Sequence, residues 1–261
     1  MSDRSQMVFT SGDQLLQATT RRRFLGMLSV GGAIVLLPGV FAACNNDDDN
    51  DTGTNPTGTP YKLDLSTDIG ILNYAYALEQ LEAAYYTSAL TSAGFAALSA
   101  NEQEVLSDLQ KHEVIHREFF KQVLGSAAIP TIAFNATTVG TLTASRDVLL
   151  RTSQLLEDTG VSAYNGAGKY LTSAAYLLIA GKIVSVEARH AAAIRDIRDG
   201  ANGRLFAGDD VVDASGLDVK AEPDTVLAGV VSLNVVTSPL TIGTLPAQSK
   251  RTPDKAAPTP Q

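Results

Sequence analysis

Glutamate and histidine recur at one fixed spacing in two places along the sequence. Glu113 precedes His116 by three residues, and Glu187 precedes His190 by the same interval. On an α-helix, residues three apart share a face, so the carboxylate and the imidazole of each pair can reach one ion. The chain has only three histidines, so chance rarely produces two such pairs. The spacing predicts a metal site shared by two helices, against the alternative of solvated or internally hydrogen-bonded histidines.

Two further glutamates, Glu79 and Glu157, fall on apolar stripes with a helical period. A tyrosine follows each of them after seven residues, at Tyr86 and Tyr164. A buried carboxylate is costly unless it is paired or bound to a metal, so both acids are expected in the same site. Glu82 lies on nearly the same helix face as Glu79 and is an alternative ligand. The tyrosines either place their hydroxyls beside the ions or are ordinary core aromatics. The predicted metal ligands are Glu79, Glu113, His116, Glu157, Glu187 and His190.

The stripes that carry these residues have the three-and-four spacing of amphipathic helices. Capping signals bound them: Ser99 with Glu102 forms a capping box, and Gly125 ends the same stripe. Gly160 is a point at which the third helix can kink. Four helices of this length predict an all-α four-helix bundle. The predicted helices cover residues 67–92, 99–125, 143–168 and 172–200.

The connections between these helices indicate how they pair. Short turns make antiparallel hairpins of the first two and the last two helices. Each hairpin then brings its two glutamates to the same height. The connection 126–142 contains Pro130 and has no helical period. Extended, it spans roughly 55 Å, more than the length of a helix of about 35–40 Å, so it can return along the bundle. We therefore expect two stacked hairpins joined by a long crossover, with the second and third helices parallel.

With four glutamates and two E-x-x-H pairs, the sequence resembles the ferritin-like superfamily of dinuclear carboxylate proteins. More narrowly, the segments LNYAYALEQLEAAYY, LEDTGVSAYNGAG and VSVEARHAAAIRD look like the exported ferritin-like domain family that includes plant desiccation-related proteins. The resemblance covers residues 66–200 and implies a bundle that holds two Fe or Mn ions. It also implies that Glu113 and Glu187 bridge the ions, and that His116 and His190 each bind one of them.

The resemblance does not imply one reaction, because the fold serves ferroxidases, peroxidases, manganese catalases and oxygenases. A carboxylate-rich site with two histidines suits redox chemistry on peroxide, dioxygen or Fe(II) better than hydrolysis. We therefore expect a role in defence against oxidative stress. A non-catalytic structural or stress-protection bundle is the alternative.

His112 completes the pattern H-E-x-x-H, which is typical of zinc metalloproteases in which two histidines bind zinc and the glutamate is the base. This interpretation leaves Glu157, Glu187 and His190 without a role. In the bundle, His112 is instead expected to lie on the surface or beside the ligands.

The N-terminal segment 1–44 has the features of an export signal. Arg21 and Arg22 precede an uncharged run from Phe24 to Ala43 that is rich in Leu, Val, Ala and Gly. The paired arginines resemble the twin-arginine signal, whose pathway exports folded proteins. A retained transmembrane anchor is the alternative, since about twenty uncharged residues can just cross a bilayer.

Cys44 is the only cysteine and directly follows two alanines. This context resembles a lipoprotein processing site, with simple cleavage after Ala42 or Ala43 as the alternative. A single cysteine excludes an internal disulfide, so the exported domain must be held by its core or by metal. Residues 45–65, rich in Asp, Thr, Gly and Pro, predict a flexible tether. The expected location is the periplasm or cell envelope.

The charge and the C-terminal part of the chain bear on its partners. The formal net charge is −8, and the part after Cys44 is more acidic still, so nucleic acid is not an expected partner. Residues 201–245 form an extension with a short helix or strand expected to cover one bundle end, and residues 246–261 predict a disordered tail. The tether and extension favour small homo-oligomers over a ferritin-like shell. Membrane contact is expected only through the signal or a lipid.

Overall fold

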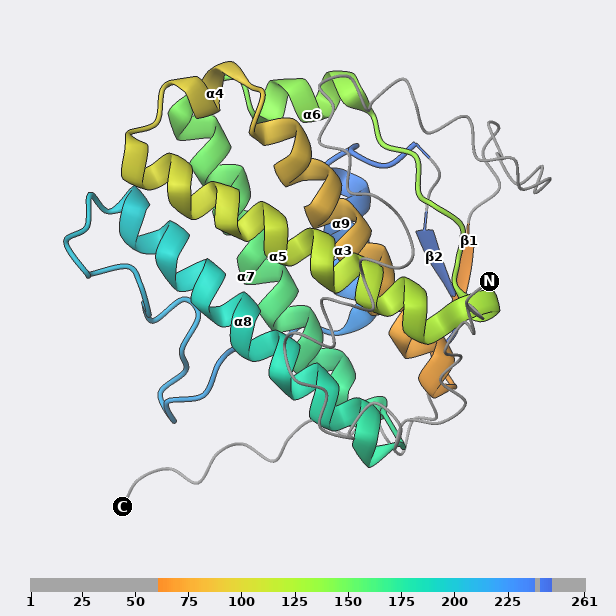
Figure 1. Cartoon of the computed structure of the whole chain (residues 1–261). Helices are drawn as coiled ribbons and strands as arrows, with labels where there is room; N and C mark the ends of the chain where they lie inside the picture. The colour runs from red at the N-terminus through yellow and green to blue at the C-terminus, as the bar shows by residue number, and fades with distance from the viewer. Residues whose placement is uncertain (1–60, 238–239, 246–261) are drawn as a thin grey trace, which may run out of the picture. The chain divides into compact units, whose positions relative to one another are not determined.

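The computed structural model describes residues 61–237 and 240–245, all of them within the unit Asn55–Gln261 (Figure 1). The predicted export signal, Cys44 and the predicted tail lie outside the described residues. None of the helices in the described segments is both long and apolar enough to pass through a lipid bilayer.

Four long helices form the domain, and a serine or threonine side chain caps the first turn of each. Thr67, Ser99, Ser145 and Ser173 accept hydrogen bonds from backbone N–H groups that have no partner within the helix. The predicted capping box of Ser99 and Glu102 is present. The all-α bundle expected from the sequence is therefore confirmed. Its helices are α3 (Asp68–Ala89), α5 (Ala100–Leu124), α7 (Arg146–Ala167) and α8 (Ala174–Arg198).

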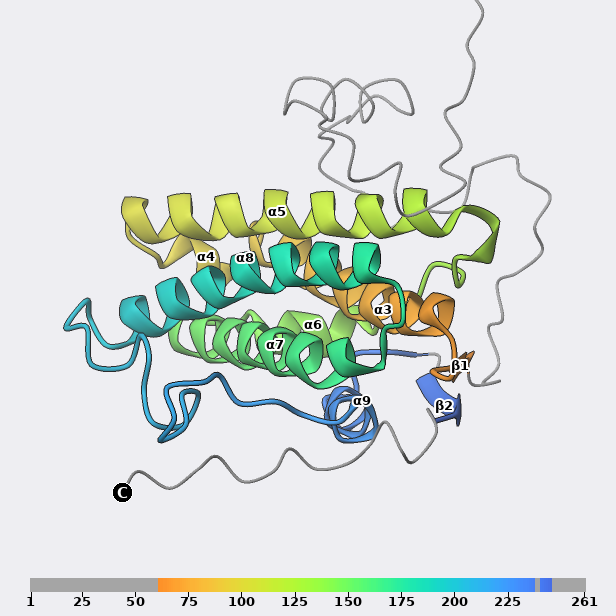
Figure 2. The same cartoon turned by 90° about the horizontal axis from the view of Figure 1, so that it is seen from below.

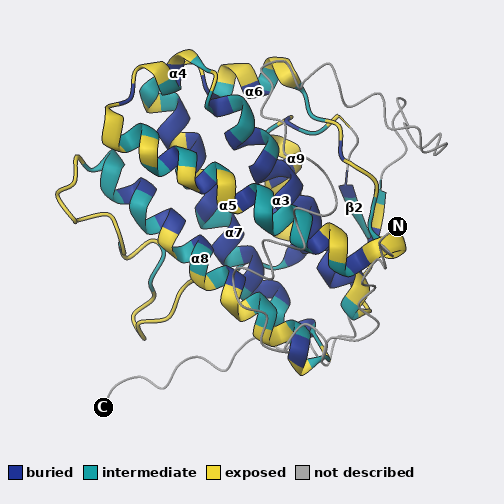
Figure 3. Cartoon of the chain, viewed as in Figure 1, coloured by how far each residue is buried: buried dark blue, intermediate teal, exposed yellow. Residues whose placement is uncertain are grey.

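The helices pair as two hairpins, α3 with α5 and α7 with α8. Figure 2 shows the chain colour advancing in the same direction along α5 and α7, so these two helices are parallel. The crossover that joins them, which includes the short helix η2 (Gly125–Ala127), must therefore travel the length of the bundle. Figure 3 shows buried residues on the inner sides of the long helices and exposed ones on the outer faces of α5 and α8.

Polar side chains of α3 fix the path of this crossover. Asn73 accepts a hydrogen bond from the crossover's backbone and donates another to it near its start. Further along α3, the Oε1 atom of Gln80 accepts from the N–H of Ile132 at 2.8 Å. Beyond the end of α3, the N–H of Gly94 donates to the carbonyl of Thr143 at 3.1 Å. The crossover thus follows α3 from the first turns of this helix to its far end. These contacts satisfy backbone groups of the crossover.

The structure corrects several predicted helix boundaries. Part of the connection 126–142 is itself helical, as α6 (Ala136–Leu142). Thr143 does not open the third helix; its hydroxyl donates to the carbonyl of Val139 and closes α6, and α7 begins at Arg146 after the cap Ser145. The predicted first helix, 67–92, ends at Ala89, and the separate short helix α4 (Ala93–Ala96) follows it. The short helix η3 (Gly168–Tyr170) follows α7.

The C-terminal extension packs along the bundle rather than over one end of it. Its helix α9 (Pro223–Ser232) lies against α7, as Figure 2 shows. Its strand β2 (Leu240–Thr244) pairs in parallel with β1 (Tyr61–Asp64), just before α3. The expected cover of one bundle end is therefore wrong, because the apolar face of α9 is buried on the side of the bundle.

A buried arginine ties the start of this extension to the bundle. The guanidinium of Arg195 on α8 is 2 % exposed and donates to Asp158 on α7 at 2.8 Å. It also donates to Asp210 in the extension at 2.7 Å. Because a buried arginine needs carboxylate partners, these contacts hold the loop after α8 against the two helices.

Candidate metal centre

The six predicted ligands come together in the middle of the bundle. Each of the four long helices contributes one glutamate, and all four glutamates are 0 % exposed. Their side chains form two groups of four in which the potential ligand atoms lie within 4.8 Å of one another. Glu113 and Glu187 belong to both groups. One group is Glu79, Glu113, His116 and Glu187, and the other is Glu113, Glu157, Glu187 and His190.

The two shared glutamates each direct one oxygen to each half of the site. Oε1 of Glu113 lies 2.8 Å from Nδ1 of His190, and its Oε2 lies 3.5 Å from Nδ1 of His116. Glu187 has the reverse arrangement: its Oε1 lies 2.8 Å from Nδ1 of His116, and its Oε2 lies 3.5 Å from Nδ1 of His190. A carboxylate placed in this way can bridge two ions, with one oxygen on each.

The other two glutamates each serve one half and are held by a tyrosine of the opposite hairpin. Glu79 on α3 lies 3.4 Å from Nδ1 of His116, and Glu157 on α7 lies at 3.3 Å from the histidine of its own hairpin. Tyr164 on α7 donates its hydroxyl to Oε1 of Glu79. Tyr86 on α3 donates to Oε1 of Glu157 at 2.6 Å. Each hydroxyl occupies one carboxylate oxygen and leaves the second oxygen directed into the site.

The inward-facing atoms of this site are buried and lack hydrogen bonds. Although they lie close to one another, the contacts do not have hydrogen-bond geometry, because the atoms face a common centre. Each unsatisfied buried polar group costs about 1–3 kcal/mol, and more when it is charged. Two divalent cations would satisfy these atoms and balance the four negative carboxylates. The atoms are Oε2 of Glu79, both oxygens of Glu113 and Glu187, Oε2 of Glu157, and Nδ1 of His116 and His190.

Burial and the close charges of the site shift the pKa values of its ligands. Burial raises the pKa of Glu79 and of Glu157 to about 8 each. Burial also opposes ionisation of Glu113, but the contacts with His116 and His190 outweigh it and lower the pKa of Glu113 to about 2. For His190, burial disfavours the cation, yet the surrounding carboxylates raise its pKa to about 12. A metal ion must displace these protons, so metal uptake is expected to release protons and to strengthen as the pH rises.

Glu82, the alternative ligand, lies beside the two groups and belongs to neither. Burial first, and then the nearby carboxyl groups of Glu113 and Glu187, raise the pKa of Glu82 well above its ordinary value. Room for it comes from Gly160 on α7, where an added Cβ would lie 3.1 Å from Oε1 of Glu82. α7 runs unbroken through Gly160. Sequence reasoning missed this fit. Its signal was the spacing: Gly160 follows Glu157 by three residues, as Glu82 follows Glu79.

His112 contacts a predicted ligand and belongs to neither group of four. Its Nδ1 lies 2.9 Å from Nε2 of His190, the ring nitrogen that points away from the carboxylates. If Nδ1 of His190 binds an ion, its Nε2 keeps a proton and donates a hydrogen bond to Nδ1 of His112. This hydrogen bond fixes the orientation of the ligand. The geometry does not support the zinc interpretation of H-E-x-x-H, because His112 faces another histidine and Glu113 lies among the ligands.

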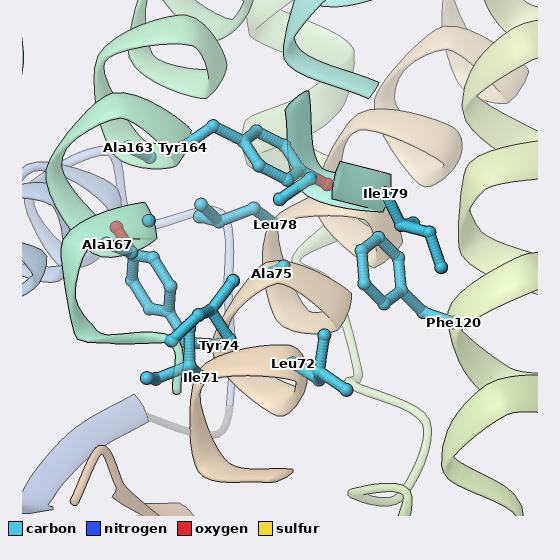
Figure 4. A pocket seen from close by; sticks show the side chains of 13 residues that line it. Ile71, Leu72, Tyr74, Ala75, Leu78, Phe120, Ala163, Tyr164, Ala167 and Ile179 are labelled. Atoms are coloured by element: carbon cyan, nitrogen blue, oxygen red, sulfur yellow. The ribbon is translucent and has the colours of Figure 1, made fainter. Parts of the chain in front are cut away.

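Apolar packing closes the site on the side of Tyr164. Figure 4 shows the ring of Tyr164 above Leu78, with Ile71 and Leu72 lower on α3, and Phe120 and Ile179 across from them. The hollow between these side chains has a volume of only about 20 Å³. This hollow has room for little more than a water molecule.

The comparisons with known proteins agree with this architecture. A family model described as a ferritin-like domain matches residues 67–199, which include all four long helices and all six grouped ligands. A comparison with curated proteins finds no match. The matched region covers just over half of the chain, and the structure within it is a helical bundle around a buried cluster of glutamates and histidines that can hold metal. The chain belongs to the ferritin-like domain family.

Proposed function

We propose that this domain binds two Fe or Mn ions and uses them for redox chemistry on peroxide, dioxygen or Fe(II). The observation that carries the proposal is the pair of four-residue groups that share Glu113 and Glu187. Buried atoms directed at a common centre without hydrogen bonds are the arrangement expected of metal ligands. The site fits a pair of ions better than one, because each shared carboxylate faces both histidines.

The donor atoms indicate which kind of ion the site prefers. Four carboxylates and two imidazoles suit hard or borderline divalent ions, and the described residues of the site offer no thiolate. When bound, a pair of redox-active ions of this kind supplies one-electron steps and oxygen chemistry that protein side chains cannot.

The residues of the chain have separate tasks in this proposal. Glu113 and Glu187 set the separation of the two positions, while the tyrosine hydroxyls keep Glu79 and Glu157 turned inward. The surrounding bundle excludes water from the carboxylates, which are fully buried. Glu79 and Glu157 hold protons in the metal-free site and release them when metal binds.

The sequence also supports export to the periplasm or cell envelope, through Arg21 and Arg22, with lipid attachment at Cys44. Replacing both arginines with lysine is expected to leave the precursor in the cytoplasm, and Cys44→Ala is expected to release a lipid-free form. Cell fractionation and mass spectrometry of the N-terminus measure both outcomes. Unchanged fractionation of both variants would reject this route and favour a retained anchor.

The test of the chemistry is a single panel of reactions. Protein loaded with Fe(II) or Mn(II) is assayed for peroxide loss, oxygen evolution and Fe(II) oxidation, beside Glu113→Ala and the control Glu104→Ala. Glu104 is exposed on the same helix, so its replacement leaves the site intact. We expect activity in wild type and in the control, and its loss in Glu113→Ala. Stoichiometric metal with no activity above that of Glu113→Ala under any loading would instead identify a non-catalytic metal-binding bundle.

A further inference from the structure

The bundle contains a second hollow, which differs from the one in Figure 4. It lies between α3, α7 and α9 and has a volume of about 230 Å³. A cavity of roughly 150 Å³ is enough to bind benzene, so this one can hold a molecule larger than a single ring. Leu78 lines both hollows, but only the larger one has room for an organic molecule.

The walls of the larger cavity are mostly apolar. Residues from α3 and α7 form the inner side, and α9 of the C-terminal extension forms the outer side. Thr225, Gly229 and Ser232 on α9 are exposed, so the cavity reaches the protein surface along that helix. The apolar lining includes Leu78, Leu81, Leu155, Leu156, Val226, Val230 and Leu233.

Glu82 is the one acidic side chain in this lining. It is 4 % exposed, and burial and neighbouring charges act on its carboxyl group without a hydrogen bond from any described residue. Gly160, which also lines the cavity, leaves space for its carboxyl group. Glu79 of the candidate metal centre lies one helical turn before Glu82 on α3, and the charges of the ligand carboxylates act on Glu82. The cavity therefore leads from the surface, past apolar walls, to a buried carboxyl group beside the metal centre.

We propose that this cavity binds a small organic molecule with an apolar body and one hydrogen-bonding head group, oriented with the head at Glu82. Apolar walls favour the body, and a buried carboxyl without a partner favours a head that can hydrogen bond to it. Peroxide or dioxygen alone would not need walls of this size. That the bound molecule is a reactant of the metal centre rests on the function proposed above, whereas the binding site itself does not.

The experiment is a ¹⁹F NMR titration of the purified full chain, as isolated, with 4-fluorophenol and with fluorobenzene. The two probes share an apolar ring and differ in the hydroxyl head. We expect saturable binding of both probes, with about tenfold tighter binding of 4-fluorophenol, since one net hydrogen bond contributes about that factor. In Glu82→Leu, this preference should disappear while fluorobenzene still binds.

A matched pair of variants on α9 tests the location. Gly229→Phe adds a ring at a lining position where a Cβ meets open space, and is expected to weaken both probes at least tenfold. Ala228→Phe adds the same ring at an exposed neighbouring position outside the lining and is expected to change neither affinity. Absence of saturable binding to wild type would overturn the proposal. An unchanged preference in Glu82→Leu, or equal affinities in the two phenylalanine variants, would also overturn it. Because metal content is measured separately, a failed metal centre and a failed cavity give different results.

Discussion

The two hairpins of the bundle build the candidate metal centre in the same way but differ in what surrounds it. Glu79 with Tyr86 on α3 corresponds to Glu157 with Tyr164 on α7, 78 residues later in the chain. Each tyrosine donates to the glutamate of the other hairpin. The residues that neighbour these ligands are not equivalent in the two hairpins. The ligands follow a repeat, whereas access and support of the site do not.

Two pairs of equivalent positions carry this difference. Glu82 on α3 corresponds to Gly160 on α7, so one hairpin provides a carboxyl group and the other provides the space for it. His112 on α5 corresponds to Val186 on α8. Only the first of these can hydrogen bond to a ligand histidine, and it does so with His190. A ligand set that repeats in both hairpins can therefore lie in surroundings that differ between them.

The largest expected effect separates shared ligands from those of one hairpin. Glu113→Gln or Glu187→Gln removes a carboxylate from both groups, so both ions should be lost together. Glu79→Gln or Glu157→Gln touches one group, and one ion should remain with near wild-type affinity. Metal analysis of dialysed protein measures the stoichiometry, with circular dichroism as the folding control. If Glu113→Gln retained one ion, the shared role of this residue would be rejected.

A second effect concerns stability, to which both halves should contribute. A ligand at 100 times its Kd stabilises a protein by about 2.7 kcal/mol, or roughly 5 kcal/mol for two ions. At about 2–4 °C per kcal/mol for a protein of this size, chelation should lower Tm by roughly 10–20 °C. Scanning calorimetry with and without chelator measures the change. A shift equally large in Glu113→Gln would show that it does not come from this site.

The metal-free protein should respond to pH in the opposite direction to the loaded one. The pKa of Glu79 and of Glu157 is raised from about 4.5 to about 8, so the folded state keeps protons that the unfolded state releases between these values. Its stability should therefore fall as the pH rises from about 4.5 to 8. The loaded protein should gain stability over the same range, because protons compete with metal. In the double variant Glu79→Gln, Glu157→Gln, the metal-free slope should flatten; an unchanged slope would contradict the proton-storing role.

His112→Ala should sharpen the difference between the two ions. Loss of a partner of a ligand histidine commonly costs 10–100-fold in metal affinity. We expect this loss only for the ion at His190, since Val186 supports no equivalent contact in the other half. Competition with a metal-sensitive dye resolves the two affinities, and Val186→Ala is the matched control. Equal weakening of both ions in His112→Ala would argue against the inequivalence.

The smallest effect is expected at Gly160. Gly160→Ala places a Cβ about 3.1 Å from Oε1 of Glu82, so the carboxyl group must shift by a few tenths of an ångström. Alanine gains up to about 1 kcal/mol over glycine in a helix, so the net change in unfolding free energy should stay within about 1 kcal/mol. Affinity for 4-fluorophenol should fall several-fold with two ions retained. Gly181→Ala on α8, where a Cβ meets open space, should gain stability and leave the affinity unchanged.

The bundle itself could be predicted because its signals are local. Apolar spacing, the capping box at Ser99 and the glycine stops are all properties of neighbouring residues. The E-x-x-H pairs and the helix lengths then suffice to bring six side chains of the four helices together. The length of the crossover predicted its return along the bundle, but its exact path could not be predicted, since that path depends on Asn73 and Gln80 of a distant helix. α6 was missed because its β-branched threonines have low helix propensity and its cap, Asn135, precedes no apolar stripe.

The surroundings of the site also depend on contacts that no local pattern shows. The sequence predicts a short helix or strand within residues 201–245, but its partner on the bundle could not be inferred from a single apolar segment. The fit of Gly160 to Glu82 is visible in the sequence only as a position in the internal repeat. Both misses concern the cavity rather than the ligands, since a cavity is formed by residues from three separate parts of the chain.

The central claim is that the four helices hold a pair of ions between the shared glutamates. Crystals of the protein loaded with Mn(II), measured at the manganese absorption edge, test it most directly. The account predicts two anomalous peaks per chain about 3.5–4 Å apart, both in contact with Glu113 and Glu187, one at His116 and the other at His190. Absence of a peak between these residues, or a single ion bound by His112 and His116, would contradict it.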